Sequence, residues 1–315
     1  MAVFTRVEEA DAEPFIRRFG LGALRALRPI AEGVQNTNYQ IDTDEGRFVL
    51  TLFEGPTDEA ALPFCLGLTG HAASAGLPCA RPLKDQDGRE IGCLNDRPAA
   101  ILDWLPGTWK RQPSLADQAA AGALLARLHI ACADFPLTRP DPVGPEARRA
   151  LFDRCRSRAG AADQSLLRRI APWLEDRAPG PASPLPVGPI HADYFPDNIL
   201  FEDGAPSGLI DFYFACTGIL AYDLAIAISA WGFDVEGTAQ PGEIAAFLSG
   251  YESVRPLTRA EREALPRLGA LAAVRFTLTR LHDRLFHDPG AMVTPKDPVP
   301  FLRRLDWWTS QALAA

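Results

Sequence analysis

The stretch "HADYFPDNILFEDGAPSGLIDF", residues 191–212, places polar side chains around two short apolar runs. The polar groups that flank these runs are His191, Asp193, Asp197, Asn198 and Asp211. Burying such groups between strand-like segments costs free energy unless something that they bind offsets the cost. The runs "NILF" and "GLIDF" are typical of strands, which predicts a hairpin with Asn198 and Asp211 on facing strands.

The spacing of these residues indicates phosphoryl transfer from ATP. That reaction needs a base for the attacking hydroxyl, oxygen ligands for Mg²⁺ and rigid segments that hold them together. Mg²⁺ prefers one or two carboxylates together with nucleotide phosphates. We therefore predict that Asp193 is the base and that Asn198 and Asp211 hold Mg²⁺. An exposed polar turn without function is the alternative interpretation.

The composition excludes several classes of protein. The 315 residues are 47% hydrophobic and 23% charged, enough for a large core and two lobes. A net charge of −8 argues against binding to nucleic acid or to an anionic membrane. The six cysteines form no C-x-x-C pair, the first residues turn acidic, and no apolar run is long enough to span a membrane. We expect a cytoplasmic protein with reduced thiols.

The pattern along the chain predicts an α+β architecture. The first hundred residues alternate strand-like segments with turns, including "TNYQIDT", "RFVLTLFE", "CARPLKD" and "RPAAILDWL". After a short hinge, helical periodicity dominates, near residues 114–135, 145–158, 163–177, 219–231, 242–254, 259–287 and 298–313. We predict a small antiparallel-sheet lobe over residues 1–103 and a larger, mainly helical lobe over residues 104–315.

The motif H-x-D-x-x-x-x-N followed by I-D-F resembles the protein-kinase-like superfamily in its aminoglycoside phosphotransferase and choline kinase branch. The order of sheet lobe, hinge and helical lobe agrees with it. Longer segments, such as "IAEGVQNTNYQI", "GLIDFYFACTG" and "VRFTLTRLHD", resemble the bacterial homoserine kinases built on this fold. The resemblance implies a two-lobe kinase fold and transfer of phosphate from ATP, with Mg²⁺, to the hydroxyl of L-homoserine, a step of threonine biosynthesis.

The resemblance also assigns roles to residues. Asp193 would be the catalytic base, His191 would hold the catalytic loop, and Asn198 and Asp211 would bind Mg²⁺. The turn around Gly33 would cover the ATP phosphates. The remaining nucleotide contacts would come from Asn36, Thr37 and Asn38 near the phosphates and from Leu102, Trp104 and Leu105 at the adenine.

One position departs from the superfamily pattern. Thr51 stands where most members carry the lysine that holds the α- and β-phosphates. The homoserine kinases of this type share "VLTL", so the threonine supports that subgroup. The role of Glu59, which faces the strand lysine in related kinases, is therefore open.

The acceptor site must recognise an α-amino acid. A carboxylate favours guanidinium groups, and an ammonium favours acidic or aromatic neighbours. Arg275 and Arg280 match arginines of the family pattern and are the predicted carboxylate ligands. Predicted neighbours of the ammonium are Asp197, Tyr194, Trp231 and Asp223. For each of these, a structural role is the alternative, with Asp223 as a brace of the catalytic loop.

Two other functions fit part of the pattern. The first is another small-molecule kinase of this fold, acting on choline, an aminoglycoside, methylthioribose or an amino alcohol. The second is a nucleotide-binding pseudokinase, suggested by Thr51 but disfavoured by the presence of Asp193, Asn198 and Asp211. No lysine has the context of a P-loop.

Overall fold

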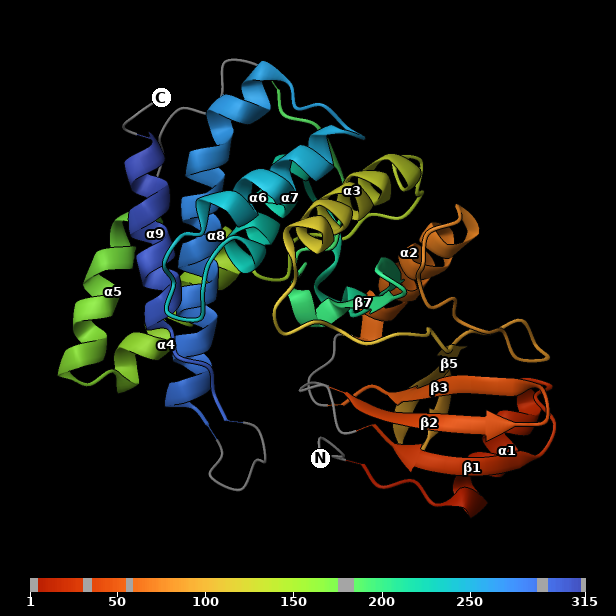
Figure 1. The fold of residues 1–315 in the computed structure, drawn as a ribbon. Helices are drawn as coiled ribbons and strands as arrows, with labels where there is room; N and C mark the ends of the chain where they lie inside the picture. The colour runs from red at the N-terminus through yellow and green to blue at the C-terminus, as the bar shows by residue number, and fades with distance from the viewer. Residues whose placement is uncertain (1–4, 31–35, 55–58, 175–183, 288–293, 313–315) are drawn as a thin grey trace.

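A computed structural model describes residues 5–30, 36–54, 59–174, 184–287 and 294–312 (Figure 1). The chain forms a sheet lobe followed by a larger helical lobe, as predicted. The last strand of the sheet ends at Asp103, and the next helix begins at Leu115. The lobe boundary predicted between residues 103 and 104 falls at the start of this connection and stays a prediction. Gly33, predicted to cover the phosphates, lies outside the described residues.

The first lobe is a five-stranded antiparallel sheet with the order β1-β2-β3-β5-β4. Its strands are β1 (Leu24–Pro29), β2 (Thr37–Thr43), β3 (Gly46–Leu52), β4 (Gly92–Leu94) and β5 (Arg97–Asp103). Helix α1 (Glu9–Arg18) precedes the sheet, and η1 (Glu59–Ala61) and α2 (Leu62–Ser74) lie between β3 and β4. The predicted hairpin between β2 and β3 is confirmed, because Thr43 pairs with Gly46.

Each face of the sheet is covered by one helix. Strand β2 alternates buried and partly exposed residues, with Tyr39 and Ile41 buried against Phe15 and Ile16 of α1. The residues that point to the other face pack against α2; these are Phe53, Ala100 and Leu102, which cluster with Leu62 and Leu66. The period of two along the strands therefore produces two small cores.

The predicted strand "CARPLKD" is not a strand of the sheet. Residues 79–85 run beside β5 and make only isolated bridges, of which Pro82 with Leu102 is one. The N–H of Asp103 donates to Arg81 O and the N–H of Leu83 donates to Ile101 O. Pro82 cannot donate a hydrogen bond, which interrupts a regular ladder.

The second lobe is built from helices around two pairs of strands. The helices are α3 (Leu115–Ala131), α4 (Pro145–Arg158), α5 (Ala161–Leu174), α6 (Leu220–Trp231), α7 (Pro241–Glu252), α8 (Arg259–Leu285) and α9 (Val299–Ala312). Strand β6 (Val187–Ile190) pairs with β9 (Cys216–Ile219), and β7 (Ile199–Glu202) pairs with β8 (Ala205–Leu209). Figure 1 shows α8 and α9 side by side and the strand pairs between the helices and the sheet lobe. Among the described helices, none has the length and apolar composition needed to cross a membrane.

Candidate active site

The strand pairs bring the predicted catalytic residues together. Asp193 lies in the loop that connects β6 to β7, and Asn198 immediately precedes β7. Ile199 pairs with Leu209, and the N–H of Ile210 donates to Asn198 O at 3.1 Å, so Asn198 and Asp211 flank the paired end of the hairpin. The Asn198 amide nitrogen donates to Asp193 O at 2.8 Å. The predicted hairpin is confirmed, but Asn198 and Asp211 lie just outside its strands β7 and β8 instead of on them.

Two residues of this site have unusual backbone conformations. Asp211 has φ 66° and ψ 62°, and Ala192 has φ 60°. Non-glycine residues rarely adopt the left-handed region, and such positions cluster at functional sites. The strained backbone at Asp211 turns the chain from the hairpin into η3 (Phe212–Phe214) and orients the carboxylate.

Burial makes both carboxylates of the site costly to ionise. Burial raises the pKa of Asp193 to about 7, and the charge of Asp211 adds to the shift. Burial likewise raises the pKa of Asp211 to about 6. Asp211 Oδ1 is buried and has no hydrogen-bond partner among the described residues. The site therefore holds negative charge that a cation would stabilise.

These residues fit Mg²⁺. Asn198 uses its amide nitrogen on Asp193 O, which leaves the amide oxygen as the atom available to a cation. The unpartnered Asp211 oxygen is a second hard donor. No group of three or more His, Cys, Asp or Glu residues in the described parts of the chain could hold a metal ion alone. A small oxygen donor set is typical of Mg²⁺ sites that nucleotide phosphates complete.

His191 holds in place the loop between β6 and β7, which contains the predicted catalytic residue Asp193. The side chain is fully buried, its Nε2 donates to Ile210 O at 3.0 Å, and its Nδ1 accepts from the N–H of Asp193 at 3.3 Å. Burial lowers the pKa of His191, so the ring is neutral. His191 thus connects the loop to the segment before Asp211, in agreement with its predicted structural part.

The carboxylate of Asp223, on α6, also holds this loop in place. Its Oδ2 accepts from the N–H of His191 at 2.8 Å and from His129 Nε2 at 3.0 Å, and its Oδ1 accepts from the N–H of Ala192 at 2.8 Å. Burial opposes ionisation of Asp223, but these hydrogen bonds hold its pKa below the usual value. Asp223 is completely buried and does not line the ammonium site. His129, on α3, also belongs to this hydrogen-bond network. The sequence did not predict its role, because the residues around a histidine in an apolar helix do not indicate one.

The side chains predicted to contact the phosphates form hydrogen bonds within the sheet lobe. Thr51 is 3% exposed and donates to Asn38 Oδ1 at 2.8 Å. Thr37 is fully buried and donates to Glu54 Oε1 at 2.7 Å, while Asn36 Oδ1 accepts from the N–H of Glu54 at 3.3 Å. The side chains of Asn36 and Thr37 therefore stabilise the end of the sheet, and their contact with phosphate stays a prediction.

Of the predicted adenine contacts, one lies inside β5 and two follow its end. Leu102 pairs with Val49 inside the sheet, so its backbone is not part of a free hinge, contrary to expectation. Trp104 and Leu105 follow the last strand pair and remain predicted adenine contacts. The Arg47 guanidinium lies 5.4 Å from the centre of the Trp104 ring.

Two of the predicted acceptor residues belong to the core. Tyr194 is fully buried and its hydroxyl donates to Ala121 O at 2.8 Å. Trp231 is 2% exposed and its Nε1 donates to Tyr194 O at 3.0 Å. Both polar atoms are used on main-chain carbonyls, which contradicts the predicted contact of these residues with an ammonium group.

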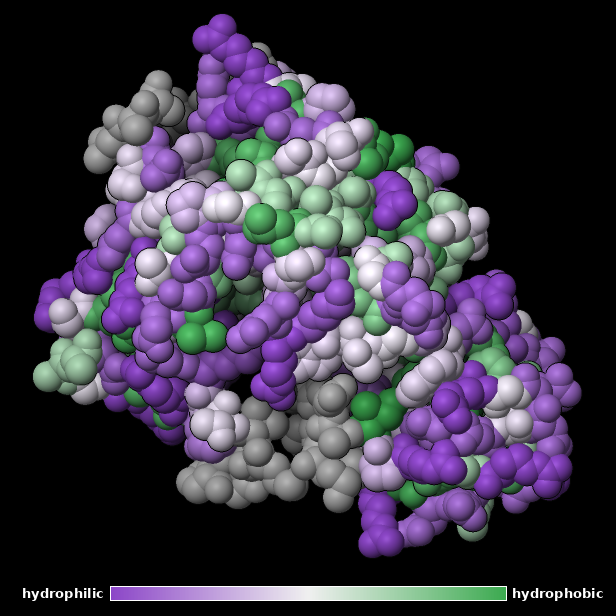
Figure 2. Space-filling model, viewed as in Figure 1, coloured by the Kyte–Doolittle hydropathy of each residue, from purple (hydrophilic) through white to green (hydrophobic). Residues whose placement is uncertain are grey.

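The other predicted acceptor residues lie near the catalytic loop in different settings. Arg275 is 2% exposed, and its guanidinium packs against the rings of Phe214 and Phe276. Arg280 is half-buried and donates to Asp297 O at 3.2 Å. Asp197 is exposed, with Oδ2 3.6 Å from Lys296 Nζ. Figure 2 shows a hollow in this face of the helical lobe, with hydrophilic residues along part of its rim.

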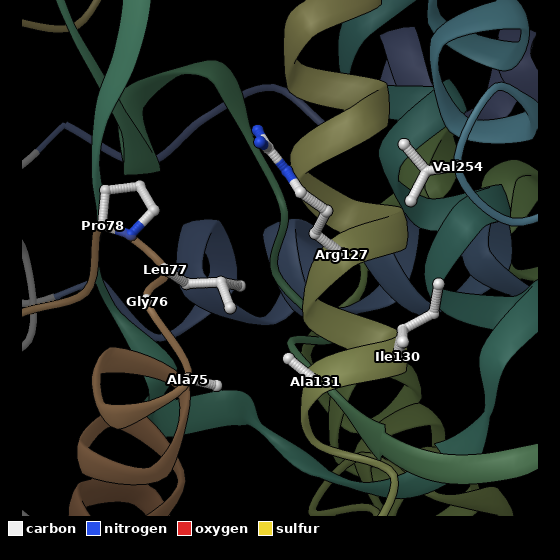
Figure 3. A pocket seen from close by; sticks show the side chains of 8 residues that line it. All are labelled: Ala75, Gly76, Leu77, Pro78, Arg127, Ile130, Ala131 and Val254. Carbon is white, nitrogen blue, oxygen red and sulfur yellow. The ribbon is translucent and has the colours of Figure 1, made fainter.

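A separate pocket of about 330 Å³ lies between the end of α2 and helix α3. Figure 3 shows its lining, which is apolar except for Arg127, and none of the predicted site residues belongs to it. We therefore place the chemistry at the strand pairs and not in this pocket.

Comparison with known proteins agrees with the geometry. Residues 26–257 match the phosphotransferase enzyme family. A curated homoserine kinase of Gluconacetobacter diazotrophicus is 48% identical over 307 residues, which cover 97% of this chain and 96% of that protein. A homoserine kinase of Chelativorans sp. is 44% identical over 97% of this chain and 95% of its own length.

The fold is shared with solved kinase structures. An amicoumacin kinase in complex with AMP-PNP, Ca²⁺ and Ami superimposes with a TM-score of 0.70 at 13% identity, covering 96% of this chain and 94% of that one. At this identity the likeness concerns the fold alone. The family match and the two relatives extend over most of the sequence, and the chain therefore belongs to the phosphotransferase enzyme family.

Proposed function

We propose that this protein is a homoserine kinase that transfers the γ-phosphate of ATP to the hydroxyl of L-homoserine, giving O-phospho-L-homoserine and ADP. One observation carries the proposal. The acid and amide groups of Asp193, Asn198 and Asp211 converge at the strand ends in a chain that is 48% and 44% identical to curated homoserine kinases.

Asp193 acts as the base. Its carboxylate accepts a hydrogen bond from the substrate hydroxyl and takes the proton as the oxygen bonds to the γ-phosphorus and the bond to ADP breaks. A pKa of about 7 keeps part of the Asp193 population ionised near neutral pH while making it a stronger base than an exposed aspartate. The Asn198 amide, which donates to Asp193 O, fixes the position of this residue.

Asn198 and Asp211 are the residues that would hold Mg²⁺. When bound, Mg²⁺ supplies the positive charge that neutralises the phosphates during transfer. Asp211 Oδ1 provides one oxygen, and the Asn198 amide oxygen provides another. The buried Thr51 brings no charge to the phosphates, so the cation would supply the charge that the strand lysine supplies in related kinases.

Charge near the catalytic loop favours an amino acid over a polycation as acceptor. Arg280 and Arg275 both act electrostatically on Asp193, which places positive charge beside the base. Aminoglycosides and choline carry no carboxylate for these arginines to bind, which favours an amino acid over them. The exposed Asp197, whose Oδ2 lies 3.6 Å from Lys296 Nζ, is the proposed partner of the substrate ammonium, which would take the place of this lysine. We also propose a cytoplasmic location, because all six cysteines are free.

The function is tested by an ADP-release assay with L-homoserine, choline and kanamycin as acceptors. Turnover should require Mg²⁺ and should be at least ~100-fold faster, as kcat/KM, with L-homoserine than with either cation, a difference expected when a buried polar group recognises its partner. Preferred turnover of choline or kanamycin would contradict the assignment. Failure to release ADP with any acceptor would instead favour the pseudokinase.

A further inference from the structure

Arg304 of α9 belongs to the same cluster as Arg280 of α8. The guanidinium carbon of each lies 4.4 Å from the centre of the Phe301 ring. Arg304 also lies 5.2 Å from the Phe233 ring, so aromatic side chains hold it in place. The two arginines come from neighbouring helices and lie close to one another around one phenylalanine.

The Arg304 guanidinium is buried and mostly unpartnered. The residue is 6% exposed, and its Nη2 donates to Asp234 O at 3.2 Å. Its Nε and Nη1 are buried and have no hydrogen-bond partner in the described parts of the chain. Arg280 donates to another main-chain oxygen, Asp297 O. Both arginines thus hydrogen-bond to backbone carbonyls, and no ion pair to a carboxylate is formed by either guanidinium in the described parts of the chain.

Two such cations destabilise each other unless an anion binds between them. Burial lowers the pKa of Arg280 to about 10, and burial together with the charge of Arg280 lowers the pKa of Arg304 to about 10. Uncompensated buried charge is unfavourable, and a guanidinium fork with free N–H groups matches a carboxylate. The cluster therefore has the chemistry of a carboxylate site.

The arginine cluster lies next to the loop that contains Asp193, because the rings of Phe195 and Phe301 are neighbours. Phe195, two residues after Asp193, has its ring 6.2 Å from Phe301 and 5.0 Å from Phe276. The charge of Asp193 also acts on Arg280. The hydroxyl and the carboxylate of homoserine are separated by three carbon atoms, so the inference requires the acceptor to extend from Asp193 toward Arg280, on which the charge of Asp193 acts.

We propose that Arg304, together with Arg280, binds the carboxylate of the acceptor and selects an amino acid over an amino alcohol. This inference rests on the proposed function and takes Arg304 in place of Arg275, because Arg304 shares the Phe301 ring with Arg280 and has two buried nitrogens without a partner among the described residues, whereas Arg275 has one. Arg304 is a binding residue with no part in proton transfer. A purely structural Arg304, stacked between Phe233 and Phe301, is the alternative.

The test compares Arg304→Gln and Arg280→Gln with Arg303→Gln as the matched control. Arg303 is the adjacent residue, is exposed and donates to Glu236 O instead. The KM for L-homoserine should rise ~10- to 100-fold in R304Q and in R280Q, the loss expected for a charged hydrogen bond. The KM for ATP, and the inhibition constant of 3-aminopropan-1-ol, which lacks the carboxylate, should stay within about twofold of the wild type. R303Q should match the wild type throughout.

The outcomes separate the two proposals. A wild type that does not phosphorylate homoserine contradicts the proposed function and this inference with it. A wild type that does, with R304Q leaving the KM for homoserine unchanged, contradicts the inference alone, whatever the effect of R280Q. A structural Arg304 would lower the melting temperature and change both KM values together. If R304Q does not fold, the KM for homoserine is measured in Arg304→Lys and in R280Q instead. An unchanged KM in both variants overturns the inference.

Discussion

At the scale of single residues, the site keeps two carboxylates where burial opposes their charge. Asp193 and Asp211 both have raised pKa values, and Asp211 sits in a left-handed backbone conformation. Neither feature helps the chain to fold. Both make sense if the residues bind a cation and a reacting hydroxyl, since strain and perturbed pKa values cluster where chemistry occurs.

Replacing Asp193 by Asn removes the base and keeps the shape. We expect kcat for homoserine to fall ~100- to 10,000-fold, the usual contribution of a general base, while Mg·ATP still binds. Steady-state kinetics measures the first effect, and titration calorimetry with Mg²⁺ and a non-hydrolysable ATP analogue measures the second. Asp203→Asn is the control, because Asp203 is exposed in the turn of the same hairpin. Turnover of D193N at the wild-type rate would disprove the assigned base.

At the scale of elements, close helix contacts position the brace under the catalytic loop. Helices α3 and α7 cross at two glycines, Gly122 and Gly250. Helix α3 carries His129, whose Nδ1 lies 2.8 Å from the Tyr251 hydroxyl of α7, and whose other nitrogen contacts Asp223. The crossing therefore sets the distance between α3, α7 and the loop that Asp223 holds.

Adding one methyl group at this crossing should destabilise the protein. A Cβ at Gly250 would lie 1.9 Å from Ala119 O, and main-chain atoms cannot move aside cheaply. We expect Gly250→Ala to cost at least ~3 kcal/mol of unfolding free energy, at the upper end for an overpacked core. Gly242→Ala is the control in the same helix, because its Cβ would meet only Leu115 Cδ2 at 3.9 Å. Urea denaturation compares them, and equal midpoints for the two variants would show that the helices separate freely.

At the scale of the whole molecule, the lobes meet beside the site. The Tyr213 ring, two residues after Asp211, lies 5.4 Å from the ring of Phe53, which follows β3. Arg139 Nη1 donates to Tyr213 O at 2.7 Å and to Ala215 O at 2.8 Å, which fixes this segment to the helical lobe. The acidic site thus lies where the two lobes join, and its charge affects the stability of the entire fold.

This charge predicts a pH-dependent difference between the wild type and D193N. Asp193 has a pKa of about 7 in the folded state and ~3.9 in the unfolded state, so the folded state binds its proton more tightly. The resulting penalty is absent below both values, develops as pH rises between them and is complete above pH ~7. Without Mg²⁺, D193N should therefore be more stable than the wild type at pH 8, by ~1–3 kcal/mol, and about equal to it at pH 4.

Thermal melts in EDTA at pH 4, 5 and 8 measure this difference. Mg²⁺ with ADP should raise the melting temperature of the wild type at pH 8, because ligands that bind only the folded state stabilise it. D203N should follow the wild type at each pH. A D193N protein that melts below the wild type at pH 8 would contradict the unfavourable burial of this carboxylate.

Much of this protein is predictable from local sequence, for a physical reason. The hairpin between β2 and β3, the helices from α3 to α9 and the meeting of Asn198 with Asp211 depend on residues close together in the chain. Turn chemistry and hydrophobic periodicity act over the same short distances. The segment 79–85 differed from expectation because proline content, which interrupts pairing, outweighed its strand-like composition.

The sequence by itself determined the two-lobe architecture and the triad of Asp193, Asn198 and Asp211, because their spacing alone places them at the ends of paired strands. Only the tertiary structure decided which side chains are buried or free around that triad. Tyr194 faces the core because α3 lies behind it, and Arg304 joins Arg280 because α8 and α9 pack around Phe301. The orientation of a helical side chain depends on the partner helix, and that partner is far away in sequence.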